Sequence, residues 1–456
     1  MGAFNSKEVF KDYYNEYLED FKTLLKCPSV LDKFDPKRVD APFGLGVRLA
    51  LDKMLEIGSR MGFKCTNVDN YCGFMDYGEG DEMLIILAHL DVVPATGAWS
   101  HDPFDPVIKN NRIYARGTSD DKGPLLSCLY ALKMLKDEGF VPNKKIRFFV
   151  GCDEESGSRC LEHYLFKYGQ AEYGFSPDAL YPLIYAEKGI SGIMFKGKSN
   201  SNIVSFKCGT VLNIVPDVAE ATIKDMNLEK EFKEFLEEFN LRGSTEDNTY
   251  KLFGKACHGS MPQLGINAGL YLSHFLSKYI SDPFLEFQEK YLFNDFIAER
   301  FGVSHHDIEM GDISNNAGVI KMENGEFSIG CNFRYPKGFD FDKSMEHISE
   351  LVKEFNISLE VLSNSPVHYV PKDSKLVHDL LNAYKKWVEY APFSKDIEPL
   401  SIGGGTYARD FKNAVAFGAL FPGEEDSMHM IDESSDLDNL ILSVYIYKDA
   451  IKNICE

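Results

Sequence analysis

The stretch LIILAHLD, residues 84–91, contains the feature around which the rest of the chain can be interpreted. Its first half is an unbroken apolar run, which is typical of a strand buried on both faces. It ends in His89, Leu90 and Asp91. Residues two apart in a strand point to the same side, so His89 and Asp91 are expected to face the same way. Two polar groups at the end of such a strand predict a ligand-binding site.

The overall composition narrows the class of protein. A chain of 456 residues is longer than one hydrophobic core usually supports, so two domains are expected. The net charge of -21 argues against nucleic acid and anionic membrane surfaces as partners. No stretch is long and apolar enough to span a bilayer. The first residues also lack the basic-then-apolar pattern of a signal peptide.

The ten cysteines are scattered, and none forms a C-x-x-C pair. In a large chain without a predicted signal peptide, this indicates reduced thiols and a cytoplasmic location. No cysteine-based zinc site is visible. Any metal is therefore expected to be held by histidines and carboxylates.

The order of the expected elements predicts the fold class. A strand at 84–91, a helix at 124–138 and a strand at 145–152 indicate an α/β domain with a mostly parallel sheet flanked by helices. Helices are also expected at 6–26 and 45–62, a short polar stretch between the second helix and the strand at 84–91, and a loop at 92–112. From about residue 190 to 370, strands and helices mix in an α+β pattern. We predict a discontinuous catalytic domain, 1–188 and 374–456, interrupted by an inserted domain, 189–373.

Five short motifs carry chemically active side chains, and four of them lie at predicted strand ends or in the loops beyond. In open α/β sheets, ligands bind at the carboxyl ends of the strands. Histidine and carboxylate ligands suit zinc, manganese or cobalt. The motifs are HLD at 89–91, RGTSDDKGP at 116–124, GCDEESG at 151–157, SPDA at 176–179 and SMHMIDE at 427–433.

The number of carboxylates predicts two metal ions, because so many negative charges would repel one another around a single ion. Asp120 lies in a tight turn, where a carboxylate can most easily bridge two ions. Asp91 is expected to orient His89 from behind rather than to bind metal. Glu154 and Glu155 are adjacent and should point in different directions, so one can bind metal while the other acts as a general base. That combination predicts hydrolysis of an amide bond.

Each motif has an ordinary explanation when it is taken alone. An isolated HLD is a metal site roughly one time in ten, since polar strand ends often only cap a loop. The Asp-Asp-Lys-Gly turn resembles any helix start, where Asp is favoured. Glu-Glu-Ser and Ser-Pro-Asp are unremarkable by themselves. Their occurrence together, in this order and at predicted strand ends, favours a single functional site.

Together these motifs resemble the dinuclear metallopeptidase family of aminoacylase, carboxypeptidase G and carnosinase, and within it the bacterial dipeptidases most of all. The resemblance covers nearly the whole chain. It implies a cis peptide bond after Asp120, the role of general base for Glu154, and Asp91 as the partner of His89. It also implies two ligand sets that share Asp120: His89, Asp120 and Asp178 for one ion, and Asp120, Glu155 and His429 for the other.

The same resemblance implies that the inserted domain is a lid that grips the substrate. His258, in CHGSMP at 257–262, would polarise the scissile carbonyl. Asn213 and Arg334 would bind the substrate, with Arg334 clasping a terminal carboxylate. Without the resemblance, His258 and Arg334 would be taken for an ordinary loop histidine and a strand-end cation. A glycine turn would let the backbone approach the same carboxylate, through Gly403, Gly404 and Gly405.

The sequence therefore predicts a metal-dependent dipeptidase that acts on small peptides with two divalent ions, zinc first and manganese or cobalt as alternatives. A large inserted domain that stands in for a partner subunit favours a monomer. An N-acyl-amino-acid deacylase or a carnosinase-like dipeptidase is the nearest alternative, and the apolar neighbours of His429 leave the substrate preference open. A non-catalytic binding protein is disfavoured because every expected position is filled. A dimetal phosphoesterase would need a cluster of phosphate-binding cations, and none stands out.

Overall fold

The computed structural model describes residues 4–456, which divide into two compact units. Unit 1 contains the residues up to Ala186, together with Tyr369–Leu400 and Gly405–Glu456. Unit 2 contains Glu187–His368 and Ser401–Gly404. The sequence-based boundaries, after residues 188 and 373, did not include the return of the chain to unit 2 at Ser401–Gly404.

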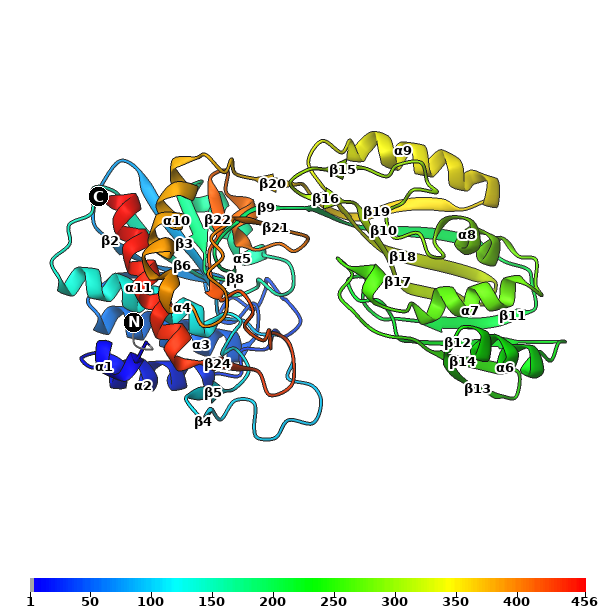
Figure 1. Cartoon of the computed structure of the whole chain (residues 1–456), viewed down its shortest axis with the longest axis horizontal. Helices are drawn as coiled ribbons and strands as arrows, with labels where there is room; N and C mark the ends of the chain where they lie inside the picture. Colours follow the sequence, from blue (N-terminus) through cyan, green and yellow to red (C-terminus); the bar gives the residue numbers. More distant parts are fainter. Residues whose placement is uncertain (1–3) are drawn as a thin grey trace. The chain divides into compact units, whose positions relative to one another are not determined.

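Unit 1 is built on a sheet whose four central strands, β6, β3, β7 and β22, run parallel to one another (Figure 1). The strands beside them, β2 and β9, are antiparallel to their neighbours. The predicted α/β class with a mostly parallel sheet is thereby confirmed. The strand order is β1 (Lys64–Val68), β2 (Cys72–Tyr77), β6 (Lys145–Gly151), β3 (Met83–His89), β7 (Tyr173–Ser176), β22 (Ala414–Ala416), β9 (Ile184–Glu187) and β20 (His368–Tyr369), with β21 (Leu400–Ile402) also paired to β9.

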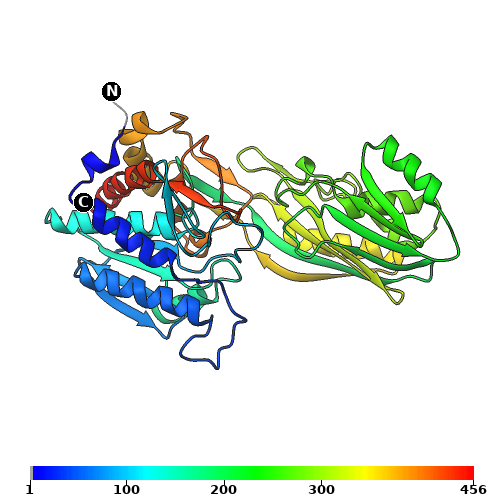
Figure 2. The ribbon, with the colours of Figure 1, turned by 90° about the horizontal axis from the view of Figure 1, so that it is seen from below.

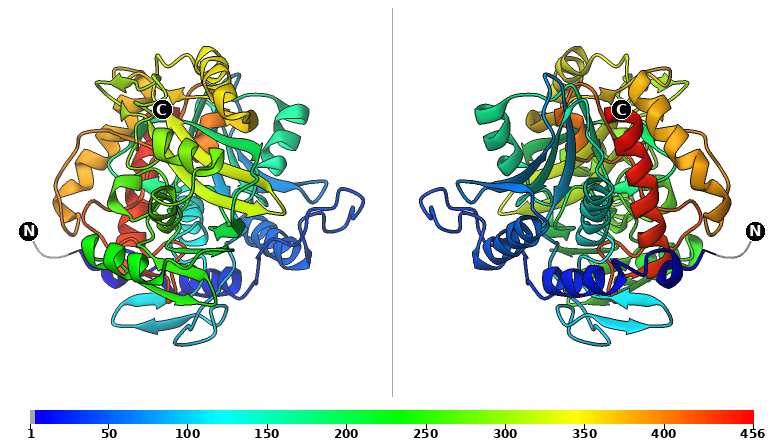
Figure 3. Two further views of the ribbon diagram at one scale, coloured as in Figure 1. Left: turned by 90° about the vertical axis from the view of Figure 1, so that its right-hand side faces the viewer. Right: turned by 90° about the vertical axis from the view of Figure 1, so that its left-hand side faces the viewer.

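Helices cover both faces of this sheet (Figure 3). The carboxyl-terminal helix α11 packs between α4 and α10, while α3 packs on β1 and β2. Ser374 and Asp436 cap α10 and α11 by accepting backbone N–H groups of the first helical turn. The helices of unit 1 are α1 (Ser6–Val9), α2 (Tyr14–Leu25), α3 (Leu45–Arg60), α4 (Lys122–Asp137), α5 (Arg159–Tyr168), α10 (Lys375–Trp387) and α11 (Leu437–Cys455).

Strand β3 lies in the middle of the sheet, and its side chains from Leu84 to Ala88 are completely buried. Burial on both faces explains why this strand has no polar alternation. Other segments of unit 1 pair in smaller sheets. These are β4 (Val107–Lys109), β5 (Arg112–Tyr114) and β24 (Ser434–Asp436) in one sheet, and β8 (Ala179–Leu180) with β23 (Ala419–Leu420) in another.

Unit 2 is an antiparallel sheet of eight strands (Figures 1 and 2). A short pair, β15 (His306–Asp307) and β16 (Gly311–Asp312), lies apart from it. The order is β13 (Arg242–Glu246), β14 (Thr249–Phe253), β12 (Val218–Ile223), β11 (Ile203–Cys208), β17 (Ser314–Glu323), β18 (Glu326–Tyr335), β10 (Gly189–Lys198) and β19 (Ser358–Ser365).

The core of unit 2 lies between this sheet and its helices. Phe232, Phe275 and Phe284 come from the helices and share one buried cluster with Phe195 and Ile329 from the strands. The helices are α6 (Glu229–Glu238), α7 (Ala268–Ser277), α8 (Pro283–Tyr291) and α9 (Phe341–Leu351).

Three predictions about local structure were wrong. The helix expected at 6–26 is two helices, α1 and α2; Phe10, Tyr14 and Tyr17 stay buried at helical spacing across the break, so the pattern hides it. The segment between 62 and 84, expected to be only a short polar stretch, contains β1 and β2; β1 is half-exposed, which removes the apolar signal of a strand. The expected loop at 92–112 contains β4, whose three residues are all exposed. In the described part of the chain, no helix has the length and apolar character needed to cross a membrane.

Candidate metal centre

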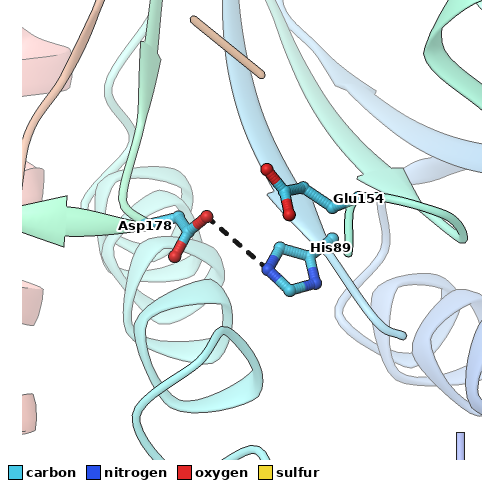
Figure 4. A group of neighbouring side chains, drawn as sticks. All are labelled: His89, Glu154 and Asp178. Carbon is cyan, nitrogen blue, oxygen red and sulfur yellow. Dashed lines mark ion pairs between the residues drawn. The ribbon is translucent and has the colours of Figure 1, made fainter. Parts of the chain in front are cut away.

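The predicted site residues of unit 1 meet at one edge of the parallel sheet. His89 ends β3, Glu154 follows the end of β6, and Asp178 follows the end of β7. Because these strands are parallel neighbours, their carboxyl ends lie side by side. Figure 4 shows the three side chains pointing toward one another.

Asp120 lies between the two predicted histidine ligands. Its Oδ1 is 2.9 Å from Nε2 of His89, and its Oδ2 is 2.8 Å from Nε2 of His429. Asp120 comes from the turn before α4, and the peptide bond that follows it is cis, as the resemblance implied. His429 comes from the segment before β24, 309 positions further along the chain. One carboxylate thus faces an imidazole with each oxygen, which is the arrangement of a bridging ligand.

Further carboxylates stand beside each histidine. Asp178 Oδ2 is 3.6 Å from His89 Nε2, and Glu155 Oε1 is 3.2 Å from His429 Nε2. Two groups bring one possible ligand atom from each residue within 4.8 Å of the others: His89, Glu154 and Asp178, and His89, Asp120 and Glu155. These groups omit His429 and differ from the sets that the resemblance implied. The pairwise distances are the better guide, because they use both oxygens of Asp120 and so include His429.

The hydrogen bonds of His89 leave one ring nitrogen available for a cation. Its Nδ1 is 2.9 Å from the carbonyl oxygen of Asp91, which can only accept, so Nδ1 carries the hydrogen. Nε2 and Asp120 Oδ1 are then two lone-pair atoms that face each other. Both atoms are buried, and neither has a hydrogen-bond partner in the described part of the chain. A divalent cation bound to both would satisfy them, so these residues fit the predicted metal.

The electrostatics of the cluster lead to the same conclusion. Burial raises the pKa of Glu154 well above its usual range, and burial together with the Asp120 charge raises the pKa of Glu155 to about 7. Hydrogen bonds to Asp120 and Glu155 raise the pKa of His429 to about 11. Glu154, Glu155 and His429 are pushed toward their protonated forms, whereas hydrogen bonds from His429 and His89 lower the pKa of Asp120. The raised pKa values indicate an excess of negative charge. Divalent cations would supply the missing positive charge.

Asp91 makes contacts that the sequence did not predict. Its completely buried carboxylate accepts the backbone N–H groups of Glu154 and Glu155, each at 3.1 Å. Its Oδ1 is 3.6 Å from His89 Nδ1, which is beyond hydrogen-bonding distance, whereas its main-chain carbonyl holds that ring. The side chain of Asp91 therefore fixes the loop that carries Glu154 and Glu155.

Comparison with known proteins identifies the family. A model described as "Peptidase family M20/M25/M40" matches residues 85–453. The chain belongs to this family. It is 38% identical over 470 residues to a protein named "Putative dipeptidase" from Staphylococcus aureus strain bovine RF122 / ET3-1, covering 98% of this chain and 99% of that one. A protein of the same name from strain MW2 matches to the same extent. The resemblance drawn from the motifs is confirmed, and the chain is a metallopeptidase.

Solved structures of the M20 family share the fold. Human carnosine dipeptidase 1 aligns with a TM-score of 0.62 at 14% identity, over 98% of each chain. The dipeptidase Dug1p of Saccharomyces cerevisiae aligns with a TM-score of 0.56 at 14% identity, over 99% of each chain. At this identity the likeness concerns the fold alone.

In unit 2, the structure gathers most of the residues predicted to bind substrate. Arg334, at the end of β18, is buried and donates from Nη1 to the carbonyl of Gly403, and its Nη2 is 3.5 Å from His258 Nε2. The carbonyl of Asn213 accepts from Gly259, the residue after His258. Gly404 also lies in unit 2, whereas Gly405 belongs to unit 1.

Three buried residues near the predicted ligands were missed by sequence reasoning. Tyr407 packs edge-on to His89, with ring centroids 6.3 Å apart. Glu433 and Arg116 form an ion pair of 2.6 Å, with both side chains at most 2% exposed. Glu433 and Arg116 lie inside the quoted motifs, each four residues from a predicted ligand, and that position was the available signal.

Proposed function

We propose that this M20 peptidase is a dipeptidase that hydrolyses the peptide bond of short peptides with two divalent cations. The observation that carries the proposal is the position of Asp120, whose two oxygens lie 2.9 Å from the ring of His89 and 2.8 Å from that of His429. The names of the Staphylococcus aureus relatives support the substrate class.

The proposed ligand sets share Asp120. His89 and Asp178 complete one set, and Glu155 and His429 complete the other. Imidazole and carboxylate donors suit zinc, with manganese or cobalt as alternatives. When bound, such cations would lower the pKa of a water molecule and polarise the scissile carbonyl.

Glu154 is the proposed general base. It takes a proton from the attacking water and passes it to the leaving amine, so that the products are a new carboxylate and a free amine. Its backbone is held by Asp91, and its side chain points toward those of His89 and Asp178 (Figure 4). In unit 2, Arg334 and Asn213 are proposed to bind the substrate, and His258 to stabilise the negative charge on the carbonyl oxygen. The glycine turn at Gly403, Gly404 and Gly405 is proposed to let backbone approach the terminal carboxylate.

A substrate screen tests the proposal. Metal-free protein would be supplied in turn with zinc, manganese and cobalt, and assayed with dipeptides, tripeptides and N-acyl amino acids. We expect dipeptides to be hydrolysed fastest. Faster hydrolysis of N-acyl amino acids would instead indicate a deacylase, and a preference for Xaa-His would indicate a carnosinase-like enzyme. The monomeric state and the cytoplasmic location stay predictions, which gel filtration and fractionation of cells can test.

A further inference from the structure

The carboxylate of Glu433 is bonded to one short segment far upstream in the chain. It accepts the backbone N–H groups of Gly117 at 3.1 Å, Ser119 at 2.8 Å and Asp120 at 3.3 Å. It also accepts Nη1 of Arg116 at 2.6 Å. Glu433 is completely buried, and its hydrogen-bond partners are Arg116 and backbone N–H groups of this segment. A buried charge is tolerated only when it is paired and hydrogen-bonded in this way.

Each of the two segments also donates hydrogen bonds to the other. Arg116, which is 2% exposed, donates from Nη2 to the carbonyl of His429 at 3.4 Å. Ser435 donates to the carbonyl of Thr118, and β24 pairs with β5. Arg116 also lies over the ring of Trp99, 5.1 Å from its centroid. The segment that carries His429 is therefore fastened to the segment that carries Asp120.

The geometry points to Glu433 and Arg116 as a positioning pair that sets where Asp120 and His429 stand relative to each other, and hence how tightly the centre binds metal. This inference rests on the proposed metal centre. Neither side chain binds metal or substrate. They act through the backbone of Asp120 and the carbonyl of His429, in the way that hydrogen-bond partners of ligands tune metal sites elsewhere.

The variant E433Q tests the inference with little change of shape. A glutamine oxygen can still accept from Gly117, Ser119 and Asp120, but its amide group then meets the guanidinium of Arg116, donor against donor. The N–H of Gly117 also loses the second of its two acceptor oxygens. Removing the hydrogen-bond partners of metal ligands typically weakens metal binding by about 10- to 100-fold. Titration of metal-free protein with Zn²⁺ should therefore show that Kd for at least one ion rises by about this factor.

The variant E424Q is the matched control. Glu424 is half-buried and accepts from Asn439 and from the backbone of Phe421, and it has no contact with the ligand segments among the described hydrogen bonds. We expect E424Q to bind both ions like the wild type. The second variant, R116K, keeps the positive charge but loses the planar fork that reaches both Glu433 and His429, so it should weaken binding in the same direction.

The outcomes separate this inference from the proposed function. If wild-type protein binds two ions and E433Q binds both with unchanged Kd, the positioning role is refuted while the metal centre stands. If E433Q and E424Q weaken binding equally, the effect is a general loosening of the fold and the inference is refuted. If E433Q does not fold, R116K decides by the same criterion. A wild-type chain that binds no Zn²⁺ would overturn the metal centre and this inference with it.

Discussion

Replacing Asp91 by asparagine separates two explanations of why this residue is needed. The sequence predicts that Asp91 orients His89. In the structure, the main-chain carbonyl of Asp91 holds the His89 ring at 2.9 Å, and its side chain instead accepts the N–H groups of Glu154 and Glu155. Asparagine keeps the carbonyl and one acceptor oxygen, but it turns the other oxygen into a donor. D91N should therefore disturb the glutamates and spare the histidine.

The magnitude follows from the single contact that is lost. One buried N–H of the pair is left facing an amide group, which costs about 1–3 kcal/mol. If this cost falls on the transition state because Glu154 moves, kcat falls by about 5- to 150-fold, at 1.36 kcal/mol for each factor of ten. Metal binding through His89 should stay close to that of the wild type, since the bond to its ring is unchanged.

The assay combines dipeptide turnover with measurement of bound metal and of the melting temperature. D153N serves as the control, because Asp153 is also completely buried in this loop but is bonded to Arg159. D153N should lower the melting temperature with a smaller loss of kcat than D91N. Loss from D91N of the ion bound through His89, with the ion bound through Glu155 and His429 retained and normal turnover per metal-loaded chain, would refute the structural reasoning and restore the role inferred from sequence.

Three other predictions follow from the proposed chemistry. E154A should lower dipeptide hydrolysis by about 10²- to 10⁴-fold while metal analysis still finds the wild-type content, and a retained rate would exclude Glu154 as the base. H258A should lower kcat by about 10²- to 10³-fold with an unchanged melting temperature, because the side chain is exposed; an unchanged rate would make His258 an ordinary loop residue. Treatment with a chelator should lower the melting temperature, since cations that bind only the folded chain stabilise it, and adding zinc, manganese or cobalt should reverse the change.

The sequence predicted best where strand pattern and side-chain chemistry coincide. The apolar run at 84–88 is enough to predict a buried strand, and the polar residue that ends it must lie where the carboxyl ends of the strands meet. Asp178 follows a neighbouring parallel strand, so its convergence with His89 is a consequence of topology. The strand β1 was missed for the opposite reason: it is a half-exposed edge strand, in which burial does not impose a pattern.

The contacts of Asp91 and Glu433 were beyond sequence reasoning, because their partners are backbone N–H groups. Every residue except proline carries such a group, so the identity of a residue does not tell which backbone N–H groups a carboxylate will bind. Glu433 bonds to groups more than 300 positions upstream, and Asp91 to groups about 60 positions downstream. Only the folded arrangement of the loops selects these partners.

Asp91 and Glu433 have the same role at two places in the centre, since each binds the backbone of a segment that carries proposed site residues. Asp91 fixes the loop of Glu154 and Glu155, and Glu433 fixes the turn of Asp120. In both cases the positions of the proposed ligands and base are set through their own backbone, which has far less freedom than a side chain. The carboxylates of the cluster repel one another when no cation is bound. Buried hydrogen bonds to the main chain offset this repulsion and keep the carboxylates in place. If so, D91N should lower kcat, and E433Q should lower the affinity for metal, by more than conservative changes to the apolar side chains beneath the centre do.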